Sequence, residues 1–280
     1  MNADPSYKLA GVMGWPVAHS RSPILHNHWI AELGLRGAYV LLPVKPEHLE
    51  VALRALPVLG FAGCNLTIPH KVAAMSMVDR LDPIAQRIGA VNTIVVETDG
   101  SLTGRNTDAF GFVQSLLEAQ AEWRADRNPI TVIGAGGAAR AILAGLLDQG
   151  AREIRLVNRS LDKAQEMAEQ FGSCVRAIPW GDRCKALEDV SLLVNTTNQG
   201  MHGQEALDLN LDPLPLDALV CDIIYVPLTT PLLAAAQLRG NATINGLGML
   251  LHQARPGFEA WFGVMPHAST QLISKLLSSF

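Results

Sequence analysis

The sequence predicts an α/β protein with two domains, each built on a mostly parallel sheet. At 280 residues the chain is nearly twice the ~150 residues typical of one domain. Short β-branched runs alternate with helical patterns along both halves, the order that yields parallel sheets covered by helices. Residues 129–140 add a strand, a glycine turn and an alanine-rich helix in direct succession.

The stretch 129–140 indicates a Rossmann-type dinucleotide-binding unit. Gly134 permits the tight turn, Gly136 lets the backbone come close to a pyrophosphate, and Ala139 lets the helix pack on the strand. The N–H groups and positive dipole end of the new helix would face the phosphates.

The first half of the chain alternates strands and helices. A loop at residues 15–23 follows the first strand, and Pro23 is expected to open the first helix. The hydrophobic patterns predict strands at 8–14, 38–43 and 61–67, helices at 23–33, 47–56 and 69–81, and a hairpin of 91–97 with 101–104.

The second half begins with a helix that starts at residues 106–108 and runs to about residue 121. Further strands are expected at 154–158, 192–195, 219–225 and 243–245, and further helices at 161–171, 230–238, 247–262 with a kink at Pro256, and 269–277. We expect domains of residues 1–108, completed by C-terminal helices in 246–280, and 109–245.

Composition excludes several classes of function. The net charge of −4 does not favour a nucleic-acid partner, and no apolar run reaches the ~18 residues of a membrane span. The four cysteines form no C-x-x-C pair and the histidines no metal-ligand spacing, so we expect reduced thiols, a cytoplasmic location and no metal.

The residues after the second strand of the dinucleotide unit bear on cofactor choice. An NAD-specific unit usually has a carboxylate there for the ribose 2′-hydroxyl. This chain has Asn158, Arg159 and Ser160 instead, and an arginine with a hydroxyl suits the 2′-phosphate of NADP. The alternative is that Arg159 is a solvated charge and its neighbours cap the next helix.

Lys71 lies in the first turn of the helix expected after Pro69. The positive end of the helix dipole should disfavour the ammonium and lower the lysine pKa, which suits a general acid–base. An ordinary exposed lysine remains the alternative reading at this position.

Other polar residues have both functional and structural explanations. Asp108 is either an N-cap or, if Thr107 caps the helix, a carboxylate free to face a cleft. Ser22 is a similar N-cap candidate, whereas Ser20 has no helix to cap, and together the two hydroxyls suit a carboxylate ligand. Asn92, Tyr225 and Gln253 are individually explained as a turn residue, a half-buried aromatic and an exposed side chain.

In combination these segments resemble the shikimate dehydrogenase family. The resemblance covers nearly the whole chain in order. Its motifs are GWPVAHSRSP (14–23), NLTIPHK (65–71), GAVNT (89–93), NTDAFG (106–111), GAGGAAR (134–140), NRS (158–160), YVPLTTPL (225–232) and GMLLHQA (248–254).

The resemblance implies NADPH-dependent reduction of 3-dehydroshikimate to shikimate, with Lys71 and Asp108 as the catalytic pair. It implies substrate contacts from Ser20, Ser22, Thr67, Lys71, Asn92, Asp108, Tyr225 and Gln253. It implies NADP contacts from Gly134, Ala135, Gly136, Gly137, Ala138, Asn158, Arg159, Ser160, Thr196, Gly246 and Met249.

The chain departs from the family pattern at a few positions. The more common valine, serine and aspartate are replaced by Leu66, Asn198 and Asn245. The two asparagines put only local loop contacts in doubt. The alternatives are a quinate/shikimate dehydrogenase that uses NAD and a non-catalytic nucleotide-binding paralogue. Whether the chain forms a homodimer is left open.

Overall fold

The computed structural model describes residues 7–279, which divide into two compact units. The first unit comprises the chain up to Asp108 together with the residues from Leu251 onward. The second unit is Ala109–Leu250. Within the described residues, no helix is long and apolar enough to cross a membrane.

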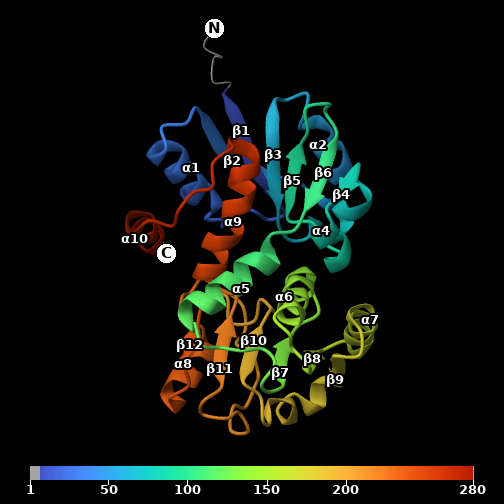
Figure 1. Ribbon diagram of the computed structural model, residues 1–280, viewed down its shortest axis with the longest axis vertical. Coiled ribbons are helices and arrows are strands. Elements are labelled where there is room, and N and C mark those ends of the chain that lie inside the picture. The colour runs from blue at the N-terminus through green and yellow to red at the C-terminus, as the bar shows by residue number, and fades with distance from the viewer. Residues whose placement is uncertain (1–6, 280) are drawn as a thin grey trace. The chain divides into compact units, whose positions relative to one another are not determined.

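The first unit is built on a six-stranded sheet of order β2-β1-β3-β5-β6-β4 (Figure 1). β1 pairs in parallel with β2 and β3, β4 pairs in parallel with β6, and β5 runs antiparallel to β3 and β6. The sheet is therefore mostly parallel, as expected. Its strands are β1 (Lys8–Gly14), β2 (Gly37–Pro43), β3 (Phe61–Leu66), β4 (Arg80–Leu81), β5 (Thr93–Val96) and β6 (Leu102–Arg105).

Helices cover both faces of this sheet. One face carries an aliphatic core that includes Leu49 and Leu53 of α2 (Leu49–Ala55) and Ala85 of α4 (Pro83–Ile88). The other carries aromatic side chains from α1 (Ser22–Glu32) and from α9 (Leu247–Phe262), which runs across β1 and β3 in Figure 1. The C-terminal helices return to the first unit, as predicted: α9 belongs to it from Leu251 onward, and α10 (Thr270–Leu277) lies within it.

Small residues lie beside two aromatic side chains on this face, Tyr39 of β2 and Trp261 of α9. In the sheet register Tyr39 lies beside Ala10, and Ala10 beside Gly63, so all three face the same side. A Cβ at Gly63 would clash with Trp261 Nε1, which donates to the Ile94 carbonyl at 2.9 Å.

The helix predicted at 69–81 is wrong in extent. The α-helix α3 spans only His70–Ala73, a 3₁₀ turn follows at Ala74–Ser76, and the chain then forms β4. Asp79 explains the switch, because its backbone N–H bonds the Leu102 carbonyl and its carboxylate accepts from the Leu102 N–H. Pairing with β6 therefore outweighs the local helical pattern.

Helix α4 was not predicted, although its signals are present in the sequence. Asp82 caps its N-terminus, Pro83 occupies the first turn, and Gly89 ends it in the left-handed region at φ 71°. These three residues indicate a separate helix only if the preceding helix is not extended as far as residue 81, as it was in the prediction.

The second unit is built on a fully parallel sheet of order β12-β11-β10-β7-β8-β9 (Figure 1). Counted from β7, this is the 3-2-1-4-5-6 order of a Rossmann fold, with its switch point between β7 and β10. The strands are β7 (Ile130–Ile133), β8 (Ile154–Asn158), β9 (Val175–Pro179), β10 (Leu192–Asn195), β11 (Leu219–Asp222) and β12 (Thr243–Ile244).

Side chains of the second sheet alternate between two cores. Ile130 and Val132 of β7 face a core with α5 (Asp108–Ala119), α6 (Gly137–Asp148) and α7 (Leu161–Phe171). Ile133 faces the other core with α8 (Pro231–Arg239). Burial on both faces explains why these strands read as continuous apolar runs.

The second sheet differs from the prediction at two strands. β9 was not predicted, because its sequence lacks a continuous apolar run. The strand expected at 219–225 ends at Asp222, whose carboxylate accepts from the Ile224 N–H at 3.1 Å and from the Thr230 hydroxyl at 2.7 Å. Those bonds turn the chain away from the sheet before Tyr225.

Candidate active site

Lys71 and Asp108 form a direct ion pair in the first unit. Lys71 Nζ lies 2.5 Å from Asp108 Oδ2, and their side chains are 19% and 5% exposed. Asp108 Oδ1 accepts from Asn92 Nδ2 at 2.9 Å, while the Asp108 backbone N–H donates to Asn106 Oδ1. The carboxylate thus points at the lysine instead of capping its own helix, whose first residue it is.

The expected influence of the helix dipole on Lys71 is not supported by this geometry. Helix α3 has only four residues, so the partial charge at its N-terminus is small. The full negative charge of Asp108 lies 2.5 Å from Nζ and is the dominant charge beside it.

Three more residues predicted for substrate binding lie in the same unit. Asn92 Nδ2 lies 3.4 Å from Gln253 Oε1, and the Gln253 carbonyl accepts from the Thr107 hydroxyl at 2.8 Å. Thr67 lies just after β3 and packs against the end of β1, where a Cβ at Gly14 would clash with its methyl group. The structure therefore brings Asn92 and Gln253 together with Asp108.

Ser20 and Ser22 lie together at the start of α1. The Ser22 backbone N–H donates to Ser20 Oγ at 3.3 Å, so Ser20 does have a helix start to bond. Ser22 is buried as the first residue of α1, and its side chain does not cap the helix. Tyr225 is half-buried and belongs to the second unit, beyond the end of β11.

Sequence reasoning missed several buried polar residues behind the ion pair. They share nearly complete burial and hydrogen bonds to one another, to Asn92 or to the neighbouring backbone. The only available signal was a polar residue inside an apolar strand pattern, as at Asn65 in β3. The group consists of Tyr39, Asn65, Thr93, Asn106 and Thr107.

The glycine turn of the second unit has the geometry expected of a phosphate-binding loop. Gly134 has φ 107°, and a Cβ there would lie 2.5 Å from Thr196 Oγ1. A Cβ at Gly136 would meet no protein atom within 4 Å, so packing does not demand glycine there. Gly136 is the N-cap of α6, which has no side-chain cap, and the open space fits a bound phosphate.

The residues next to the glycine turn also fit a phosphate-binding role. Ala135, Gly137 and Ala138 are partly exposed, whereas Ala139 is fully buried against the strand. The Thr196 hydroxyl donates to the Ile133 carbonyl at 2.7 Å and holds the turn from the adjoining strand end. These groups gather at the carboxyl ends of β7 and β10, where the sheet order reverses.

The residues after β8 place an exposed cationic side chain near that edge of the sheet. Asn158 Nδ2 donates to the Ser160 carbonyl at 2.9 Å, and the Ser160 hydroxyl makes no capping bond to α7. Arg159 is the exposed cation. The reading of Ser160 as a simple helix cap is therefore not supported.

Gly246 and Met249 have structural roles of their own. A Cβ at Gly246 would clash with the Ile223 carbonyl oxygen, and Met249 packs against the core of the second unit. The family departure at Asn245 is mild, because Asn245 Oδ1 accepts from the Leu247 N–H at 3.1 Å. Asn198 bonds Gln204 within its own loop.

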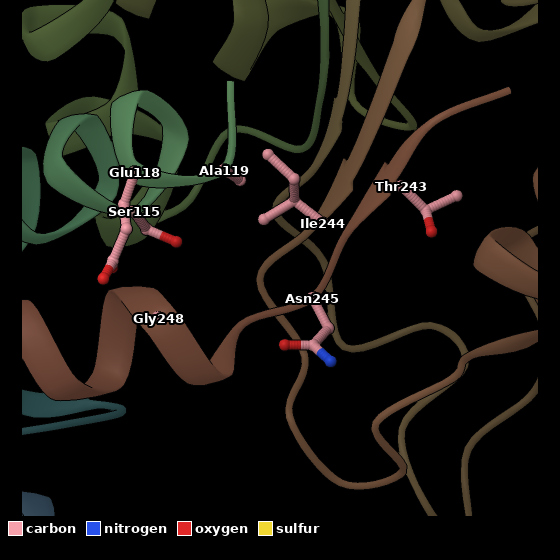
Figure 2. Close-up of a pocket in the computed structure, with 7 residues that line it drawn as sticks. All are labelled: Ser115, Glu118, Ala119, Thr243, Ile244, Asn245 and Gly248. Atoms are coloured by element: carbon pink, nitrogen blue, oxygen red, sulfur yellow. The ribbon is translucent and has the colours of Figure 1, made fainter. Parts of the chain in front are cut away.

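Figure 2 shows a pocket of about 330 Å³ in the second unit. Of its lining residues, none was predicted to bind substrate or cofactor. They are Ser115, Glu118, Ala119, Thr243, Ile244, Asn245 and Gly248. Among residues 7–279, no cluster of three or more His, Cys, Asp or Glu side chains could hold a metal ion.

Comparison with known proteins identifies the family. Residues 12–94 match the shikimate dehydrogenase substrate binding domain, and residues 115–204 match shikimate/quinate 5-dehydrogenase. The NADP(+) shikimate dehydrogenase of Paramagnetospirillum magneticum is 57% identical over 97% of this chain and 98% of its own length.

Two solved structures are also similar. Shikimate 5-dehydrogenase of Thermus thermophilus, in complex with NADP(H) and shikimate, has a TM-score of 0.86 and 35% identity over 98% of this chain and 100% of its own. Quinate dehydrogenase of Corynebacterium glutamicum, in complex with NAD, has a TM-score of 0.88 and 28% identity over 97% of this chain and 99% of its own. This chain belongs to the shikimate dehydrogenase family.

Proposed function

We propose that this chain catalyses the reversible NADPH-dependent reduction of 3-dehydroshikimate to shikimate, a step of aromatic amino-acid (chorismate) biosynthesis. The Lys71–Asp108 ion pair is the observation that carries the proposal, because it places an ammonium proton and an anchoring carboxylate side by side. The 57% identity to an NADP(+) shikimate dehydrogenase supports the substrate and the cofactor.

Most of the proposed substrate contacts lie in the first unit. Ser20 and Ser22, at the start of α1, would bind the substrate carboxylate. Asp108 would accept from the ring hydroxyls, and Asn92 would donate to them. The hydrogen bonds of Asn92 to Asp108 and Gln253 support this grouping. The proposed set is completed by Thr67, Lys71, Gln253 and, from the second unit, Tyr225.

Lys71 would act as the general acid in reduction. NADPH, when bound, supplies the hydride to the carbonyl carbon. The Lys71 ammonium gives a proton to the carbonyl oxygen, so the ketone becomes a hydroxyl and the lysine becomes a neutral amine. Its 19% exposed side chain can regain a proton from solvent. Asp108 holds the ammonium and orients it.

The second unit would bind NADP. Gly134 to Ala138 would surround the pyrophosphate at the start of α6, and Arg159 with Asn158 and Ser160 would bind the 2′-phosphate. The proposed contacts are completed by Thr196, Gly246 and Met249. Residues 109–245 are accordingly proposed as the NADP domain, and residues 1–108 with 246–280 as the substrate and catalytic domain.

Location and assembly are proposed on separate grounds. The four cysteines are free thiols, as in a protein of the reducing cytoplasm. The edge strand β2 carries the exposed apolar side chains Val40 and Leu41, a surface at which a second copy could add a strand. Sedimentation velocity measures whether a homodimer forms.

Quinate oxidation with NAD is the second candidate. The similarity to the quinate dehydrogenase of Corynebacterium glutamicum favours it. The absence of a carboxylate at residues 158–160, at and directly after the end of β8, opposes NAD, because an NAD-specific unit usually holds the ribose 2′-hydroxyl with a carboxylate there. Initial rates with shikimate or quinate and NADP⁺ or NAD⁺ separate the candidates. NADPH formation from shikimate should be fastest, and faster quinate oxidation with NAD⁺ would reject the proposal.

A further inference from the structure

A chain of buried hydrogen bonds leads from the start of α1 to the Lys71–Asp108 pair. It passes through Tyr39 of β2, Asn65 of β3 and Thr93 of β5 before it reaches Asn92. Tyr39 is 2% exposed, Asn65 5% and Thr93 0%. At such burial each polar atom needs a partner, so the pattern of donors and acceptors is constrained.

The orientation of the Asn92 amide is determined by one neighbouring group that can only donate a hydrogen bond and one that can only accept. The Thr107 backbone N–H can only donate, and its nitrogen lies 2.9 Å from Asn92 Oδ1. The Asp108 carboxylate can only accept, and its Oδ1 lies 2.9 Å from Asn92 Nδ2. Asn92 therefore presents its NH₂ group to Asp108 and its carbonyl oxygen to the interior.

The Asn65 amide is determined in the same way. The Asn92 backbone carbonyl can only accept, and Asn65 Nδ2 lies 3.1 Å from it. Asn65 Oδ1 therefore faces the Tyr39 hydroxyl at 2.6 Å, and Tyr39 must donate to it.

The hydroxyls of Thr93 and Tyr39, which bond Asn65 from its two sides, then have a single consistent direction. Thr93 Oγ1 accepts from Asn65 Nδ2 at 3.2 Å and donates to Asn92 Oδ1 at 2.8 Å. Because the Tyr39 proton goes to Asn65, its oxygen can only accept from elsewhere. Ser22 supplies that bond, and it partly offsets the burial that raises the pKa of Tyr39.

We propose that Tyr39 and Thr93 are positioning residues of the substrate site. Their hydroxyls connect Ser22, at the proposed carboxylate site, to Asn92 and Asp108 through one directed series of hydrogen bonds. Neither residue needs to touch substrate. This inference rests on the proposed function, because it assigns Ser22, Asn92 and Asp108 to substrate binding.

Conservative substitutions test the inference. Tyr39→Phe removes the hydroxyl and keeps the ring that stacks on His26 with centroids 4.0 Å apart. Thr93→Val keeps the shape of the side chain, and Thr93→Ser restores the hydroxyl. Thr103→Val makes the same change on the neighbouring strand β6, outside the hydrogen-bond series, and serves as the control.

Steady-state kinetics and shikimate titration calorimetry are measured on the full-length variants. We expect Tyr39→Phe and Thr93→Val to lower kcat/KM for shikimate by about 10- to 100-fold, since each leaves a buried polar partner unsatisfied. KM for NADP⁺ should stay within about two-fold in both, a selectivity consistent with loss of a local hydrogen bond. Thr93→Ser should recover most of the loss, and Thr103→Val should match the wild type.

Equal values for Thr93→Val and Thr93→Ser, or a wild-type kcat/KM in Tyr39→Phe, would overturn the inference. So would a KM for NADP⁺ that rises in parallel with that for shikimate, because it would indicate a general structural defect. A wild-type protein that binds shikimate without oxidising it would reject the proposed activity alone, and the calorimetric comparison would still decide on Tyr39 and Thr93.

Discussion

Lys71 Nζ and Asp108 Oδ2 lie 2.5 Å apart although 37 positions separate the two residues in the chain. Asp108 is 3% exposed and is also bonded by Asn92, so its carboxylate has little freedom to move. A lysine held by such a partner is presented in one orientation, as a proton donor to a substrate must be.

Replacing Lys71 by alanine should remove the proton donor. We expect kcat for shikimate oxidation to fall by about 10²- to 10⁴-fold, the usual contribution of general acid–base catalysis. KM for shikimate should change much less, because Ser20 and Ser22 remain. Steady-state rates are the measurement, with circular dichroism as the check on folding. Near-normal turnover in Lys71→Ala would remove Lys71 from the mechanism.

Replacing Arg159 by alanine should weaken the binding of NADPH more than the binding of NADH. Loss of charge-assisted hydrogen bonds to a 2′-phosphate is expected to raise KM for NADPH by about 10- to 100-fold and to leave KM for NADH nearly unchanged. Arg152→Ala is the matched control, because Arg152 is exposed and precedes β8 at the opposite end of that strand. Equal effects on both cofactors would mean that Arg159 does not contact the 2′-phosphate.

The two glycines of the phosphate loop should respond differently to alanine. Gly134→Ala forces a Cβ into a left-handed backbone and against Thr196, so we expect a loss of at least about 1 kcal/mol in the free energy of unfolding. Gly136→Ala meets open space and should fold normally, yet bind NADP⁺ at least about 10-fold more weakly, because its methyl group would occupy the space of the phosphate.

Denaturant unfolding and NADP⁺ titration calorimetry check this pair. Gly181→Ala, which also adds a Cβ in open space, is the control and should match the wild type in both measurements. Unchanged NADP⁺ affinity in Gly136→Ala would show that no phosphate approaches that backbone.

Acid should destabilise the first unit through His26. This side chain is completely buried among Tyr39, Trp29 and Phe258, and burial lowers its pKa from 6.5 to about 3. Between these two pH values His26 therefore stays neutral in the folded state and is protonated in the unfolded state. Its contribution to stability is complete above pH 6.5 and is lost as the pH falls from there toward 3.

The corresponding slope is about 1.4 kcal/mol per pH unit in that window. His26→Leu should reduce the pH dependence of the unfolding free energy by this amount, measured by urea unfolding between these limits. His28→Leu, which removes a histidine from the same helix, is the comparison. If the His26→Leu and wild-type curves run parallel, His26 is not the group responsible.

Local patterns were enough to predict the strands β7, β8 and β10 of the second unit and its glycine turn. These features depend on the preferences of single residues: β-branched side chains favour extended backbone, and Gly134 permits a positive φ that other residues avoid. The family motifs are also local strings, and they singled out Lys71 and Asp108 without any knowledge of the geometry between them.

How those residues meet depends on the folded sheet. Local patterns predicted a long helix at 69–81, but pairing of Asp79 with Leu102 of β6 turned its end into a strand. The bonds from Tyr39 through Asn65 to Asn92 also depend on the sheet, because they join β2 to β3, with β1 between them, and β3 to the start of β5. Side chains distant in sequence are brought within hydrogen-bond reach by strand order and register, and local backbone preferences carry no information about either.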